Sequence, residues 1–314
     1  MKSKRVEMLV AAAVLFVSVS PVMAVIEFNG GLTHDIDYEI NDDVWVDCLS
    51  PGMGTTLNML EGGSIPFDYR LEGFEDSIIN VLGGSIYTLL IANDSTQVTV
   101  SGGVVGERPS RSGLFAYDSS QVTVTGGEID QLDASGTSQV AVSGGVIEDI
   151  HPSFSSQVTV TGGAIGRLDA WGSSQATVSG GAIEKIYARD AGRVAVTGGI
   201  VDHYVVSGNS QITISGGLLT EYFRLQDNAV LTMDGSDFAV DGTPVGYIEL
   251  ATILGGWFLD EPHRRLTGTL LNGDSLDSDF QIGHSAKIIL VPEPATILLL
   301  GFGGLALVRG RRGG

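Results

Sequence analysis

Apolar and polar residues alternate in short runs through the middle of the chain. The segment SSQVTVTGG occurs at 119–127 and, letter for letter, at 155–163, and related runs such as SQITISGG stand nearby. A period of two is typical of a β-strand with one buried face. Each run therefore predicts a strand that turns its Val and Ile inward and its hydroxyls outward.

A Gly-Gly pair closes each run and repeats at a fixed interval. The second glycines are 18 residues apart at Gly127, Gly145, Gly163, Gly181, Gly199 and Gly217, with looser copies ending at Gly63, Gly84, Gly103 and Gly235. A unit this short cannot bury its own apolar face, so such units stack on one another. Glycine suits the corner because it accepts a positive φ.

Each repeat holds two further short apolar segments. One follows the corner, at Ile129 and Leu132 in the first strict repeat, and the other is marked by Ala134. Three sides in 18 residues predict one coil of an all-β, parallel β-solenoid with coils about 4.8 Å apart. The Val-Thr-Val run and Gly-Gly corner favour a right-handed coil, although left-handed hexapeptide helices also use this length. From Gly63 to Gly235 we expect roughly nine coils and a rod of about 40 Å.

The flanking segments divide the chain further. Residues 61–235 hold the repeats, 25–60 are rich in Asp and Asn and predict an irregular first coil or N-terminal cap, and 236–290 predict hairpins that form a C-terminal β cap. The ends of a stack need such covers because they expose unpaired strand edges.

The first 24 residues, MKSKRVEMLVAAAVLFVSVSPVMA, have three early basic residues, an apolar run and small residues before Ala24. This order predicts a helical signal peptide cut by signal peptidase after Ala24. A retained N-terminal anchor is the alternative, but it needs a longer apolar run.

The last residues, 291–314, read VPEPATILLLGFGGLALVRGRRGG. The apolar stretch 295–308 is shorter than the roughly 20 residues that span a bilayer comfortably, so we expect a thin or transient transmembrane helix. Arg309, Arg311 and Arg312 follow it and predict a cytoplasmic C-terminus.

Pro292, Glu293 and Pro294, the apolar helix and the Arg-rich end closely resemble the PEP-CTERM sorting signal of bacterial exported proteins. The same tail is also described as an ice-binding protein C-terminal domain. The resemblance implies a cut near the Pro-Glu-Pro by an exosortase. It also implies an inner-membrane intermediate and delivery to the cell surface or the extracellular biofilm matrix. The three residues would be a recognition motif without chemistry of their own.

Composition limits the partners. Lys and Arg number 17 against 37 Asp and Glu, a net charge of −20. Such a chain is unsuited to nucleic acid or an anionic leaflet, so cations or neutral glycans are better partners. Cys48 is the single cysteine and forms no intramolecular disulfide, which indicates a core thiol.

Residues 18 apart become neighbours in a solenoid, so columns reveal candidate sites. Asp130 stands beside Glu148, and Glu184 beside Asp202, with Gly166 between the pairs. Facing carboxylates repel, and Ca²⁺ would relieve that repulsion. The alternative is a wet acidic face, and we expect no other cofactor.

A second column, Asp133, His151 and Asp169, places two carboxylates about 10 Å apart, a spacing that suits an inverting glycosidase. No other polar cluster converges there, so we interpret it as a solvated edge and assign no catalytic residue. EF-hand, zinc, phosphate-loop and nucleophile-elbow motifs are absent from the sequence.

The outward hydroxyls form a third column that resembles the ice-binding face of some antifreeze solenoids, although Ala141 and Ala195 interrupt it and Thr is a common strand residue. The candidate ice-binding residues are Thr123, Thr125, Thr159, Thr161, Thr177 and Thr213. A Gln column beside them predicts an amide ladder.

Together these features predict an exported, non-enzymatic solenoid with a structural or adhesive role. The alternatives are a solenoid that binds or cleaves extracellular polysaccharide and an ice-binding surface protein.

Overall fold

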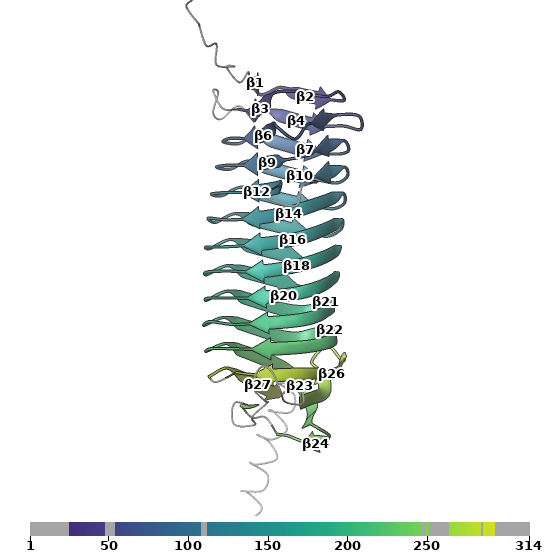
Figure 1. Ribbon diagram of the computed structural model, residues 1–314, viewed down its shortest axis with the longest axis vertical. Helices are drawn as coiled ribbons and strands as arrows, with labels where there is room; N and C mark the ends of the chain where they lie inside the picture. The colour runs from purple at the N-terminus through teal and green to yellow at the C-terminus, as the bar shows by residue number, and fades with distance from the viewer. Residues whose placement is uncertain are drawn as a thin grey trace, which may run out of the picture.

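The computed structural model describes residues 25–47, 54–107, 112–246, 249–250, 264–283 and 285–292. They form a tall all-β solenoid of about 11 turns with a period near 18 residues, and no α-helix occurs among them (Figure 1). The predicted signal helix and transmembrane helix lie outside the described residues. No helix within the described part is long and apolar enough to cross a membrane.

The Val-Thr-Val runs stack into one parallel sheet, which confirms the predicted repeat register. Gln121 pairs with Gln139, which pairs with Gln157, so equivalent residues lie directly above one another. The strands of this face are β2 Thr33–Ile36, β4 Thr56–Met59, β7 Ile78–Val81, β10 Gln97–Val100, β13 Gln121–Val124, β15 Gln139–Val142, β17 Gln157–Val160 and β19 Gln175–Val178.

The other two sides begin as separate strands and then join. The second side starts as β5 Ser64–Ile65, β8 Ser85–Ile86 and β11 Val104–Val105, and the third as β1 Val25–Phe28, β3 Asp43–Val46, β6 Arg70–Gly73, β9 Leu89–Ala92 and β12 Gly113–Ala116. Both β11 and β12 pair with β14, so from that coil onward one bent strand serves both sides. These strands are β14 Glu128–Ala134, β16 Val146–Pro152, β18 Ala164–Ala170 and β20 Ala182–Ala188.

The N-terminal segment also joins the stack. β1 pairs in parallel with β3, and β2 with β4, so residues 25–60 supply the first coils. The sequence predicts roughly nine coils from Gly63 to Gly235, and the N-terminal coils raise this number toward the observed total of about 11 turns.

At the other end the strands lengthen and the chain turns back. β21 Arg193–Val206, β22 Gln211–Leu225 and β23 Val230–Val240 are followed by β24 Thr243–Pro244, β25 Arg264–Leu270, β26 Ser275–Ile282 and β27 Lys287–Pro292. β25 runs antiparallel to both β23 and β26, whereas β26 and β27 extend the stack in parallel with β22 and β23. We call the segment from β24 to β27 the C-terminal cap.

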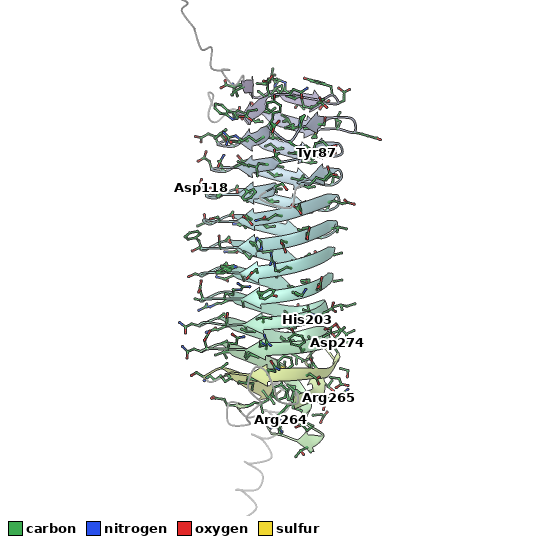
Figure 2. All side chains as sticks on the ribbon, viewed as in Figure 1. Tyr87, Asp118, His203, Arg264, Arg265 and Asp274 are labelled. Atoms are coloured by element: carbon green, nitrogen blue, oxygen red, sulfur yellow. The ribbon has the colours of Figure 1, made fainter. Side chains whose placement is uncertain are left out.

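Charged contacts join the cap strands to one another and to the coils, and Figure 2 labels three of the residues near the lower end of the rod. Arg264 Nε lies 2.7 Å from Asp241 Oδ2, and Arg265 pairs with Asp277. Asp274 accepts a hydrogen bond of 2.7 Å from the backbone N–H of Gly217, which belongs to a Gly-Gly corner. The cap therefore binds a coil 57 residues away in sequence through a specific polar contact.

The core follows the alternation. Val122 and Val124 are at most 1% exposed, and the equivalent Val158 and Val160 at most 2%. The corner-proximal positions Ile129 and Leu132 are buried as well. Because every coil repeats these positions, one continuous apolar column runs through the rod, and its burial is the main favourable term for folding.

A buried hydroxyl column accompanies the apolar one. Ser120, Ser138, Ser156 and Ser174 are fully buried at the turn that precedes each Val-Thr-Val strand. Ser156 Oγ donates to the backbone oxygen of Ser153 at 2.8 Å, whereas the hydroxyl oxygens of Ser120, Ser138 and Ser174 are buried without a hydrogen-bond partner in the described part of the chain. The small size of Ser also lets the neighbouring coils stack closely.

Candidate functional site

The acidic column lies along a shallow hollow on the bent strands. Glu148, Glu184 and Asp202 contribute to its wall, and Gly166 occupies the position where the neighbouring coils carry an acid. Small residues in the central coils leave a volume of about 640 Å³. The apolar part of the lining comprises Val146, Ala164, Ala182 and Ile200, together with inner Ile residues.

The structure brings the first predicted acidic pair together. Asp130 hydrogen-bonds to Glu148, and this bond together with the Asp130 charge raises the pKa of Glu148. At the other pair, Glu184 contacts Lys185, and Asp202 accepts a hydrogen bond from the Thr220 hydroxyl. Within the described ranges, no group of three or more His, Cys, Asp or Glu residues is placed to hold a metal ion. Calcium binding by these pairs stays a prediction.

The outward hydroxyl column is continuous in register and open to solvent. Thr99 pairs with Thr123 and Thr159 with Thr177, and the exposed candidates include Thr123, Thr125, Thr159, Thr161, Thr177 and Thr213. Ala141 and Ala195 pair directly into the same column and interrupt it. Ice binding by this face also stays a prediction.

The Asp133, His151 and Asp169 column divides into two clusters. His151 Nδ1 lies 3.0 Å from Asp133 Oδ1, and Gln131 Nε2 donates to the same oxygen at 2.9 Å. Asp169 is only 3% exposed, so the expectation of a solvated edge is wrong for this residue. Its Oδ1 lies 3.2 Å from Arg189 Nε.

Asp169 belongs to a group of contacting residues with Trp171, Tyr187 and Arg189, and we call these four, together with Phe154 on the preceding coil, the aromatic–ionic cluster. The Arg189 guanidinium carbon lies 4.7 Å from the ring centroids of both Trp171 and Tyr187. The Trp171 side chain hydrogen-bonds to Asp169. Burial raises the pKa of Asp169, and the Arg189 charge opposes that rise.

Sequence reasoning missed this cluster. Arg189 follows Asp169 by one coil plus two residues, so the pair does not fall in one 18-residue column. A signal was present at Phe154, because the residues 18 before and after it are Gly136 and Gly172. A large aromatic residue at a slot that the other strict coils fill with Gly or Asp is a visible departure from the repeat.

The sorting residues follow directly on the rod. Pro292 ends β27, where its backbone pairs with Gly235. Glu293, Pro294 and the signal cleavage residue Ala24 lie outside the described residues. A protein-family model described as the PEP-CTERM protein-sorting motif matches residues 290–312. The chain carries a PEP-CTERM sorting motif.

The PEP-CTERM motif indicates exosortase-dependent sorting of an exported protein that is anchored transiently in the membrane. Its match begins at Leu290, a buried residue of β27, so the sorting segment overlaps the last strand of the solenoid. No curated protein and no solved structure matches this PEP-CTERM chain.

Proposed function

We propose that the chain is a non-enzymatic structural or adhesive rod of the cell surface or extracellular matrix. Signal peptidase and an exosortase are its processing enzymes. The observation that carries this proposal is the PEP-CTERM match at residues 290–312, which starts where the solenoid ends. A rigid stack placed beside a sorting signal is suited to display, because processing acts on the tail and leaves the coils intact.

The arrangement of Asp169 favours this role over polysaccharide cleavage. Its carboxylate is buried and committed to Arg189, whereas a general acid or base must reach a substrate oxygen or a water. Asp133 is bound to His151 in a separate cluster. We therefore propose no catalytic role for the column.

The sorting part is tested by changing the motif and following the protein in the producing cells. Glu293→Ala should leave export intact and strand an uncut precursor in the inner membrane, because the signal peptide is unchanged. Glu128→Ala, at an exposed acid on the rod, is the matched control and should be processed normally. Intact mass and membrane fractionation report both outcomes.

Removal of residues 295–314 tests separately whether the apolar segment retains the chain in the membrane for the exosortase. The shortened chain should be released in soluble form and should not reach the final location, because nothing retains it for the exosortase. If the shortened chain reached the same location as the complete chain, this end of the sequence would carry no sorting signal and the proposal would fail.

A further inference from the structure

Phe154 occupies a turn position whose backbone conformation does not suit phenylalanine. Its φ is 54°, in the left-handed region, and the residue is 69% exposed. Gly136 and Gly172 hold the same turn position in the adjacent coils, also with positive φ. A bulky residue is strained in this region, and an exposed ring gains little from burial. Stability therefore does not explain why this turn carries phenylalanine.

Trp171 presents a second ring on the next coil. Its backbone N–H donates to the carbonyl of Pro152 at 2.9 Å, which places it one coil beyond the turn that holds Phe154, and the residue is 39% exposed. The two residues that carry the rings thus lie on successive coils, about one coil rise of 4.8 Å apart in height. Successive rings at this interval match the advance of one sugar unit in an extended polysaccharide.

The Trp171 ring is held in place before any ligand arrives. Its side chain hydrogen-bonds to the buried Asp169, and the Arg189 guanidinium covers it at 4.7 Å while also pairing with Asp169. Tyr187 supports Arg189 from a second side, again at 4.7 Å. A preorganised aromatic side chain loses little conformational freedom on binding, which is a property of effective binding anchors.

Basic groups beside the rings pair with acids, and one exposed acid, Asp190, lies further along the turn column that holds Phe154. Arg189 pairs with Asp169, Arg167 Nη2 contacts Asp149 Oδ2 at 2.6 Å, and His151 contacts Asp133. The whole chain has a net charge of −20, which repels anionic polymers from any distance. Exposed rings with flanking polar groups, on a chain that repels anions, are complementary to a neutral ligand that has apolar faces and many hydroxyls.

We propose that the aromatic–ionic cluster binds a neutral polysaccharide chain, with Phe154 and Trp171 packing against the apolar faces of successive sugar rings. The hydroxyls of the polysaccharide would contact the polar groups that flank the two rings. This inference goes beyond the proposed surface role and does not depend on processing of the tail. A failure of polysaccharide binding would therefore leave the sorting proposal intact, and a failure of sorting would leave the binding proposal intact.

The test is affinity gel electrophoresis of the purified full chain with three neutral polymers, hydroxyethyl cellulose, galactomannan and dextran, and with alginate as the anionic polymer. At least one neutral polymer should retard the chain. Trp171→Ala and Phe154→Gly should each weaken that binding by at least about tenfold, the loss typical of a central aromatic contact. Tyr38→Ala, at an exposed ring far from the cluster in sequence, should bind unchanged.

Phe154→Gly separates binding from folding, because glycine relieves the left-handed strain. Its melting temperature should equal or exceed that of the parent chain while polysaccharide binding falls. The inference is overturned if none of the neutral polymers retards the chain, if alginate alone does, or if both ring variants bind like the parent. Ring-dependent binding of the unfolded polypeptide casein without polysaccharide binding would assign the face to protein docking and would also overturn it.

Discussion

Val160 offers the most direct check on the inward and outward assignment of the repeat. It lies on β17, is fully buried, and pairs with Val142 and Val178 on the coils above and below. Its neighbour Thr159 points to solvent on the same strand. Substitution of each by Asp places the same carboxyl group on opposite faces of one strand, so strand propensity is matched and only the environment differs.

The expected cost follows from two contributions. Removing the buried valine loses about 1.5–3 kcal/mol of hydrophobic stabilisation. An aspartate in the apolar column remains protonated, and holding it so at pH 7, about three units above its ordinary pKa, costs about 4 kcal/mol. Val160→Asp should therefore destabilise the rod by about 5.5–7 kcal/mol. Thr159→Asp should cost under about 1 kcal/mol, as is usual at an exposed position.

Denaturant unfolding followed by circular dichroism measures these differences. Val160→Ala should lower the free energy of unfolding by only about 2 kcal/mol, because the side chain loses two carbon atoms and leaves a small cavity. Because coils contact only their neighbours, Val160→Asp should also split the transition into separate phases for the two halves of the rod. Equal destabilisation by Val160→Asp and Thr159→Asp would refute the assignment of faces.

Three further outcomes are expected. If the acidic column binds Ca²⁺, chelation should lower the melting temperature, and Glu184→Gln with Asp202→Asn should remove that sensitivity; an unchanged melting temperature would leave a solvated acidic face. If the hydroxyl column binds ice, the purified solenoid should reshape growing crystals and Thr159→Tyr should stop it, whereas unmodified crystals at high concentration would remove the hypothesis. In the cap, the backbone N–H of Arg265 holds the pKa of Asp241 below its ordinary value of 3.8. This stabilisation is complete above that pH and is lost as the pH falls through the lowered pKa. The protection of β25 amides, which is their hydrogen exchange relative to an unstructured peptide at the same pH, should therefore decrease there, and a protection that does not change with pH would contradict it.

The solenoid itself was predictable because its information is local and repeated. The alternation in QVTVTGG sets which side chains face inward, and the 18-residue interval sets which residues stack, as the pairing of Gln121 with Gln139 confirms. Both are properties of a parallel stack in which each coil meets only its neighbours. The sorting motif was recognisable for a related reason, since it is a contiguous segment read at the end of the chain.

Other features depend on contacts between residues that are not one 18-residue repeat apart. The ion pair of Asp169 with Arg189 is diagonal, and it forms because burial of the carboxylate requires a partner that can reach it from the next coil. The cap contact of Asp274 with Gly217 joins residues 57 apart, across a segment with no repeat to set its register. The strain at Phe154 is a backbone property, visible only once the turn is seen to place it at positive φ. The periodic pattern thus determined the coil, where identical units stack by the same local contacts. Only the tertiary structure determined the cluster and the cap, where single residues satisfy long-range electrostatic and steric demands.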